Sequence, residues 1–389
     1  MKDIRILALI LCACFVSVAW GRPQACTAYT PWAQFHRHNM QRFNPCEKVL
    51  NVKNVGELKL KWRYTTRGGV RSAPAVVNGV VYVSSFDGNL YALDARTGAK
   101  RWSYSGNFGG CGGFCWTTPS PAVVNGVIYI GSFDNNVYAL NANTGVKLWS
   151  YTTGSGVDSS PAVADGVVYI GSRDGNVYAL NANTGVKLWS YATGGFVESS
   201  PAVANGVVYV GSNDQSIYAL NASTGALLWS YATTDWLLSS PAVANGVVYI
   251  DHFSGTLFAL DASTGVLQWS DGIGYGSASS PAVANGAVYV GGGYGSTVYG
   301  LNASTGALLW SYATGDWLQS SPAVANGVVY VGSDDGKLYA FDANTGAKLW
   351  SYHVNGGMNS SPAVANGVVY VGSEDGKVYA FGLKKGQKN

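Results

Sequence analysis

Two carboxylates, Asp158 and Glu198, occupy the same place in neighbouring copies of an internal repeat, three residues before a recurring proline. Residues at one repeat position of adjacent structural units are expected to face each other. Two close carboxylates either bind a cation or raise the pKa of one member of the pair. The position is therefore a candidate site column, and its eight residues are Arg71, Thr118, Asp158, Glu198, Leu238, Ala278, Gln319 and Asn359.

A second column lies two residues earlier and holds four aromatic residues and four glycines. Rings separated by glycines offer stacking faces and room for a planar or sugar-like ligand. Asp235, Tyr275 and Asp316 stand beside this column. We predict a ligand site from the two columns together, and its residues are Arg71, Trp116, Asp158, Phe196, Glu198, Trp236, Tyr275, Trp317, Gln319 and Asn359.

These columns belong to a sequence motif that recurs eight times. It reads S-P-A-V-x-N-G-x-V-Y, then x-Y-A-L, then N/D-A-x-T-G, then L-W-S-Y, and its prolines recur every 40 to 47 residues. A fixed period of this size is typical of a propeller or a solenoid. Each copy contains four short alternating segments separated by N-G, G-S-x-D and T-G turns, which predicts four antiparallel strands. The fold class is therefore all-β, an eight-bladed β-propeller.

The tryptophan positions indicate how the ring closes. Trp62 precedes the first complete copy, whereas the last copy ends at Gly382 without a tryptophan strand. We therefore expect 58–64 to supply the outer strand of the last blade, which removes the free edge of an open array.

The two faces of the predicted ring differ. The N-G and T-G turns share one face and are nearly uniform, whereas the loops before each proline and the G-S-x-D turns share the other face and vary. Varied loops on a rigid scaffold are where sites usually lie. Because the first strand of each copy should be innermost, the candidate column should surround the mouth of the central channel.

Composition narrows the function classes. The 389 residues carry a net charge of +3, and Lys384-Lys385 is the only basic run, so nucleic-acid binding is excluded. Lys2 and Arg5, an apolar stretch over 6–18 and a small-residue cleavage site predict export to the periplasm or beyond the cell, without a membrane span. Lipid attachment at Cys14 is the alternative. We expect a signal peptide over 1–21, an N-terminal strap over 22–54, the propeller over 55–382 and a basic tail over 383–389.

Four cysteines remain after removal of the signal peptide, and an even number in an exported chain predicts two disulfides. Their order favours Cys26 with Cys46 and Cys111 with Cys115. Cys111 and Cys115 lie in the only large insertion, 107–117. The strap is expected to pack over one end of the ring or to form a lid over the funnel.

The phrase A-x-T-G-x-x-x-W, present as A-S-T-G-A-L-L-W at 222–229, resembles the tryptophan-docking motif of pyrroloquinoline-quinone (PQQ) type repeats. The resemblance covers about 51–382 and implies the propeller fold. The family includes calcium- and PQQ-dependent alcohol dehydrogenases. It also includes non-catalytic propellers, such as the lipoprotein of the outer-membrane β-barrel assembly machinery.

For an enzyme, the resemblance implies PQQ and calcium, with Asp158 or Glu198 as base, calcium at Glu198 and Asn359, and Arg71 paired with a quinone carboxylate. Those dehydrogenases have a disulfide between neighbouring cysteines, whereas Gly-Gly-Phe separates Cys111 from Cys115. We therefore expect an exported, monomeric, non-catalytic binding or scaffold propeller without a cofactor, which holds a protein segment, a glycan or a small planar ligand on its varied face. The alternative is the calcium- and PQQ-dependent alcohol dehydrogenase.

Overall fold

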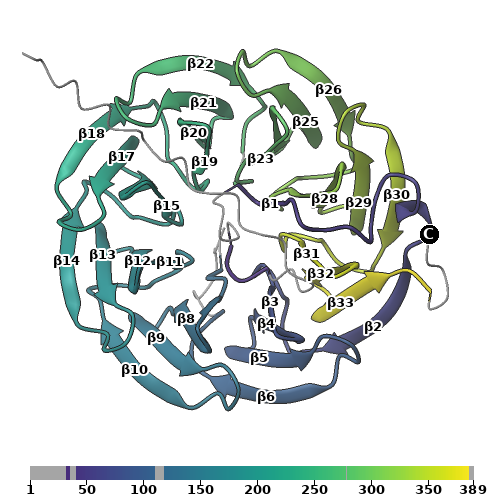
Figure 1. Ribbon diagram of the computed structural model, residues 1–389, viewed down its shortest axis with the longest axis horizontal. Coiled ribbons are helices and arrows are strands. Elements are labelled where there is room, and N and C mark those ends of the chain that lie inside the picture. The colour runs from purple at the N-terminus through teal and green to yellow at the C-terminus, as the bar shows by residue number, and fades with distance from the viewer. Residues whose placement is uncertain (1–31, 36–40, 110–117, 277, 385–389) are drawn as a thin grey trace, which may run out of the picture.

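The computed structural model describes residues 32–35, 41–109, 118–276 and 278–384. Eight antiparallel sheets surround a central channel in this part of the chain, so the predicted eight-bladed propeller is confirmed (Figure 1). We number the blades 1 to 8 by the order of their innermost strands. The only helix among the described residues is one 3-10 turn, η1 Val55–Glu57. None of the described segments forms a helix long and apolar enough to cross a membrane.

Each blade has four strands, ordered from the channel outward. The innermost strands are β3 Ala75–Val77, β7 Ala122–Val124, β11 Ala162–Ala164, β15 Ala202–Ala204, β19 Ala242–Ala244, β23 Ala282–Ala284, β27 Ala323–Ala325 and β31 Ala363–Ala365. The second strands are β4 Val80–Ser84, β8 Val127–Gly131, β12 Val167–Gly171, β16 Val207–Ser212, β20 Val247–Asp251, β24 Ala287–Gly292, β28 Val328–Gly332 and β32 Val368–Ser373.

The third strands are β5 Asn89–Asp94, β9 Asn136–Asn141, β13 Asn176–Asn181, β17 Ser216–Asn221, β21 Thr256–Asp261, β25 Thr297–Asn302, β29 Lys337–Asp342 and β33 Lys377–Gly382. The outer strands of blades 1 to 7 are β6 Lys100–Ser105, β10 Lys147–Thr152, β14 Lys187–Ala192, β18 Leu227–Ala232, β22 Leu267–Gly272, β26 Leu308–Ala313 and β30 Lys348–His353. The outer strand of blade 8 is β2 Lys59–Thr65, which pairs antiparallel with β33. The N-terminal strand therefore closes the ring, as predicted.

The repeated residues build the joint between blades, as blade 4 illustrates. Asn221 accepts the N–H groups of Ser223 and Thr224, each at 3.0 Å, and so tightens the turn before β18. Gly225 follows with φ +72°, and a Cβ there would lie 2.8 Å from the Trp189 ring of blade 3. The same Trp189 donates its indole N–H to the Ala222 carbonyl at 2.9 Å. The turn and the tryptophan are thus required together.

Two described segments of the N-terminal strap, 32–35 and 41–44, lie against the innermost strands. Strand β1 Phe43–Asn44 runs parallel to β27, and Trp32 bridges to Val76 of β3. Arg42 is fully buried and donates to the carbonyls of Phe35 and Pro322, at 2.6 and 2.8 Å. The strap contacts innermost strands five residues beyond the candidate column. These described segments therefore form the floor of the channel.

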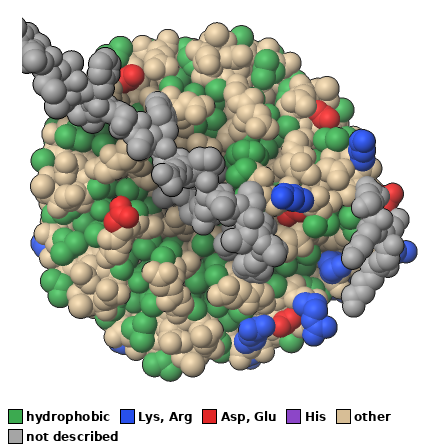
Figure 2. Space-filling view, viewed as in Figure 1, with side chains coloured by type: hydrophobic (Ala, Val, Ile, Leu, Met, Phe, Trp, Pro, Cys, Tyr) green, Lys and Arg blue, Asp and Glu red, His purple; other side chains and the backbone are tan. Residues whose placement is uncertain are grey.

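Charge is unevenly distributed around the ring. The sequence from Leu188 to Gly336, which spans blades 4 to 6, contains no Lys or Arg. Outer strands β10, β14 and β30 begin with lysine, whereas β18, β22 and β26 begin with leucine. Figure 2 agrees, because no Lys or Arg side chain appears across the top of the face, where β22 lies.

Candidate functional site

All eight residues of the candidate column line one opening at the centre of the ring, together with Phe35 of the strap. A layer of serines lies two residues further along each chain segment, one residue before the proline. The Ala73 N–H donates to Ser120 Oγ, the Ser120 N–H to Ser160 Oγ, and the pattern continues around the ring to Ser361 at 2.8–2.9 Å. Ala73 is the one member without a hydroxyl. This layer holds the column residues of adjacent blades at fixed spacing.

A second ring of side chains, which the sequence reasoning missed, contacts the candidate column. Its members occupy the variable position of the G-S-x-D turns, fifteen residues after their partners. The pairs are Asp158 with Arg173, Glu198 with Asn213, and Asn359 with Glu374. The sequence carries a signal for this ring, because the turn position varies between repeats while the next residue is aspartate in six of the eight.

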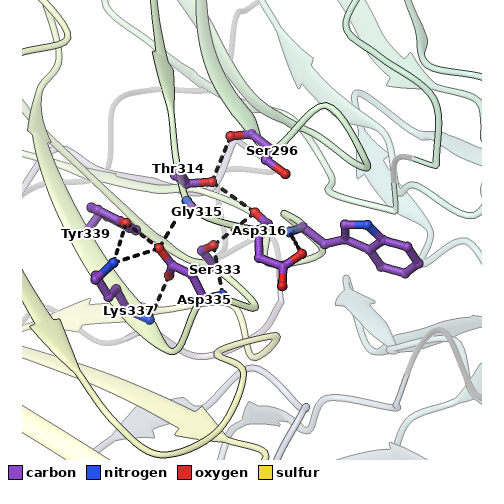
Figure 3. Close-up of polar contacts among 9 residues, drawn as sticks. Ser296, Thr314, Gly315, Asp316, Ser333, Asp335, Lys337 and Tyr339 are labelled. Carbon is purple, nitrogen blue, oxygen red and sulfur yellow. Dashed lines mark hydrogen bonds and ion pairs between the residues drawn. The ribbon is translucent and has the colours of Figure 1, made fainter.

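That neighbouring aspartate has a structural role, as Figure 3 shows for blade 7. The Asp335 carboxylate accepts the Tyr339 hydroxyl at 2.5 Å, the Lys337 ammonium at 3.1 Å and the Gly315 N–H at 3.1 Å. It thereby ties its own turn to the loop that leads into the blade. The aspartates of these turns are accordingly turn formers.

Arg173 joins two carboxylates on the blade 3 and blade 4 side of the mouth. Its Nη2 lies 2.7 Å from Asp158 Oδ2 and 2.7 Å from Glu198 Oε1. The Asp158 side chain is completely buried, and the Glu198 side chain is 7% exposed. Burial and then the charge of Glu198 raise the pKa of Asp158 to about 7, while Arg173 opposes the rise. This cluster can hold or release a proton near neutral pH.

The opposite side of the mouth, formed by blades 8 and 1, carries a different cluster. Arg71 forms an ion pair with Glu374 and lies over the Phe86 ring. The Asn359 amide donates to Glu374 Oε1 at 3.4 Å. Around this side of the mouth, three buried side-chain oxygens have no hydrogen-bond partner among the described residues, and they belong to Thr118, Gln319 and Asn359.

A pocket of about 420 Å³ opens beside the Asp158 cluster. It contrasts with the narrow channel mouth, which encloses about 60 Å³. Phe196 and Trp236 are about half exposed at the pocket. The pocket lining consists of Arg173, Gly195, Phe196, Glu198, Asn213, Trp236 and Leu238.

The predicted ligand residues do not all meet at this pocket. Glu198 and Asn359 belong to blades 4 and 8, on opposite sides of the ring, so the structure does not bring together the two predicted calcium ligands (Figure 1). Tyr275 and Trp317 lie further along the varied face. Trp116, Cys26, Cys111 and Cys115 lie outside the described residues, and Cys46 is disulfide-bonded.

A family model described as outer membrane protein assembly factor BamB matches residues 57–155, 106–196, 193–316 and 271–389. The chain belongs to this family. Its fold also resembles solved structures of two kinds. The quinohemoprotein alcohol dehydrogenase of Comamonas testosteroni superposes with a TM-score of 0.79 at 19% identity, over 92% of this chain and 82% of that one. BamB of Moraxella catarrhalis superposes with a TM-score of 0.70 at 20% identity, over 84% and 100%.

Curated relatives match shorter segments at higher identity. The dehydrogenase subunit of the quinone-dependent alcohol dehydrogenase of Gluconobacter oxydans is 37% identical over 101 residues, 23% of this chain and 13% of the relative. The quinoprotein alcohol dehydrogenase PedH of Pseudomonas putida is 38% identical over 68 residues, 16% of this chain and 11% of the relative. The matched segments thus span little more than a tenth of these relatives' own length.

These relatives correct two expectations from the sequence. The non-catalytic binding propeller and the absence of a cofactor are wrong, because the curated proteins that share this repeat are quinone-dependent alcohol dehydrogenases. The Gly-Gly-Phe that separates Cys111 from Cys115 does not exclude a dehydrogenase. A disulfide next to a site is separate from the charged groups at the channel mouth, and those groups are present here.

Proposed function

We propose that this propeller is an oxidoreductase of the quinoprotein type, which oxidises an alcohol at the mouth of its channel with PQQ as electron acceptor. The observation that carries the proposal is the Asp158–Arg173–Glu198 cluster beside a pocket of about 420 Å³. Pockets for small ligands and cofactors usually enclose about 300–1,000 Å³. The quinone-dependent relatives support the same reading.

The residues at the pocket fit a flat, anionic cofactor. Phe196 and Trp236 present half-exposed rings for stacking, and Arg173 offers a guanidinium to a carboxylate. When bound, PQQ would supply the acceptor for the two electrons that leave the alcohol carbon. The fit supports the side pocket, because the channel mouth of about 60 Å³ is too small for a fused three-ring molecule.

The protein supplies few ligands for a cation at this pocket. The described residues include no group of three His, Cys, Asp or Glu side chains that could hold a metal ion. Calcium takes six to eight oxygen ligands. A calcium ion at Glu198 would therefore draw most of its ligands from the cofactor and water, whereas Asn359 lies across the channel.

Glu198 is the base in this proposal. Its carboxylate borders both the pocket and the channel and accepts the hydroxyl proton of the alcohol. Asp158 lies behind it, fully buried and in hydrogen-bonding contact with it, and its raised pKa of about 7 lets it share that proton. Arg173 compensates the charge that the pair carries when it is deprotonated.

The test uses purified full-length protein with PQQ and Ca²⁺. Quinone binding is measured by equilibrium dialysis, and activity is measured as alcohol-dependent dye reduction. We expect Glu198→Gln to retain quinone binding within a few-fold and to lose about 10²-fold or more in turnover. The matched control is Asp165→Asn, the same change of carboxylate to amide in an exposed turn on the opposite face. Absence of quinone binding by the wild type, or full activity of Glu198→Gln, would refute the proposal.

A further inference from the structure

A row of five aromatic rings crosses the varied face over blades 4 to 7. Its members come from the loops before β19, β23 and β27 and from the turns after β20 and β24. Tyr275 is 56% exposed and Tyr294 is 43% exposed. The rings contact one another in sequence, and the row consists of Trp236, Phe253, Tyr275, Tyr294 and Trp317.

The backbone holds this row in place. The Phe253 N–H donates to the Trp236 carbonyl at 2.8 Å, the Gly276 N–H to the Phe253 carbonyl at 2.7 Å, and the Tyr294 N–H to the Tyr275 carbonyl at 2.8 Å. Gly276 has φ +84°, and a Cβ there would overlap the Tyr294 ring. The exposed rings are therefore pre-arranged, which lowers the entropic cost of binding a partner.

Acidic side chains flank both ends of the row. No Lys or Arg occurs from Leu188 to Gly336, and Arg173 shares a pocket with Trp236 at one end of the row. Asp235 flanks one end, and its carboxylate accepts the Trp236 N–H at 2.8 Å. Asp316 flanks the other end and accepts the Trp317 N–H at 2.8 Å. Aromatic faces are electron-rich and attract cations, and the carboxylates add to that attraction.

We propose that this aromatic row binds an extended, arginine- or lysine-bearing segment of another protein. Side chains on one side of an extended segment are about 6.7 Å apart, since each residue rises about 3.3 Å. The ring centroids from Trp236 to Tyr294 are separated by 6.4, 5.2 and 5.7 Å. Alternate basic side chains of such a segment can therefore each lie over a ring within the 6 Å range of a cation–π contact.

The row extends beyond the proposed oxidoreductase site. Trp236 belongs to both, but Tyr275, Tyr294 and Trp317 do not line the pocket of about 420 Å³. The two proposals can therefore fail separately, and variants at Tyr275 and Tyr294 test the row alone.

The test measures fluorescence anisotropy of labelled ten-residue peptides with the full-length protein. We expect a peptide of alternating Arg and Ser to bind at low salt and to weaken several-fold at 0.5 M salt, while its Glu-Ser counterpart does not bind. Tyr275→Ser with Tyr294→Ser should weaken binding about tenfold, since each exposed cation–π contact contributes about threefold to fivefold. The variant's alcohol-dependent dye reduction should equal that of the wild type.

The matched control is Leu228→Ser with Leu309→Ser, which removes exposed apolar side chains from outer strands of the same sector. Its peptide affinity should remain unchanged. Trp317→Ala serves as a second variant if the tyrosine pair lowers the melting temperature. Equal binding of the Glu-Ser peptide, no dependence on salt, or unchanged binding by both row variants would overturn the proposal. So would binding of a glucan hexamer in place of the Arg-Ser peptide, or self-association of the protein that the row variants abolish.

Discussion

The two sides of the channel mouth use the same kinds of side chain to different effect. On the blade 3 and 4 side, one guanidinium serves two carboxylates, and the Asp158 side chain is completely buried. On the blade 8 and 1 side, Arg71 pairs with Glu374, and both side chains are about a quarter exposed, while the charge of Asp334 also acts on this pair. The first cluster borders the large pocket, whereas neither Arg71 nor Glu374 lines it.

The difference shows what complete burial of a carboxylate achieves. A one-to-one ion pair that water reaches contributes little beyond local order. Burial and then the charge of Glu198 raise the pKa of Asp158 to about 7, although Arg173 pairs with both carboxylates. Burial also raises the pKa of Asp334 on the other side, whereas Asp158 is completely buried and belongs to the cluster beside the large pocket.

Replacement of Arg173 or Arg71 should give the largest difference in stability between the two sides of the mouth. Arg173→Ala leaves two buried carboxylates without a counter-charge and should lower the free energy of unfolding by about 3–5 kcal/mol at pH 7.5. Arg71→Ala breaks a partly exposed pair and should cost about 1 kcal/mol or less. Urea unfolding of both variants measures the contrast. Similar losses from the two variants would contradict it.

The pH dependence of stability gives the next largest contrast. Because the pKa of Asp158 is raised in the folded state, the native protein binds more protons than the unfolded chain between about pH 4 and pH 7. Its contribution to stability therefore falls as pH rises through that window, with a slope of at most about 1.4 kcal/mol per pH unit for one proton. Asp158→Asn should remove this slope and Arg71→Ala should retain it. Urea unfolding at several pH values measures the slope of the free energy of unfolding against pH. Equal slopes for the wild type and Asp158→Asn would contradict the assignment of this slope to Asp158.

The serine layer should give the smallest effect. It is continuous past Asp158 and Glu198, but Ala73 interrupts it on the Arg71 side. Ala73→Ser supplies the missing hydroxyl and should stabilise the protein by about 0.5–1 kcal/mol, the usual net value of one hydrogen bond. The midpoint of urea unfolding reports the gain. A loss of stability would mean that the side of the mouth formed by blades 8 and 1 has no room for the added oxygen.

Much of the architecture could be predicted because the fold repeats one four-stranded unit with the same turns. Trp62 comes before the first complete repeat, and this position predicts that β2 belongs to the last blade. The fixed interval before each proline predicts that the candidate column lies on the channel wall. Uniform turns such as Asn221 to Gly225 specify their own geometry, so a single sequence identifies them.

The variable turn position marks the second ring in the sequence, but the individual contacts within the mouth do not follow from it. Arg173 contacts Asp158 from the turn after β12, whereas Asp158 precedes β11, and the ion pair also reaches Glu198 of the next blade. The distance across the ring likewise separates Glu198 from Asn359, although both occupy the same repeat position. The aromatic row also joins two columns, since Tyr275 and Tyr294 come from a loop and a turn of different blades.

The most direct measurement is the pH profile of alcohol-dependent dye reduction by the full-length protein with PQQ and Ca²⁺. The wild type should be active, with a limb near pH 7 that reports the Asp158–Glu198 pair. Asp158→Asn should shift that limb, Glu198→Gln should abolish turnover, and Asp165→Asn should reproduce the wild-type profile. No turnover by the wild type, or a profile that none of these variants alters, would contradict the assignment of oxidoreductase chemistry to this side of the mouth.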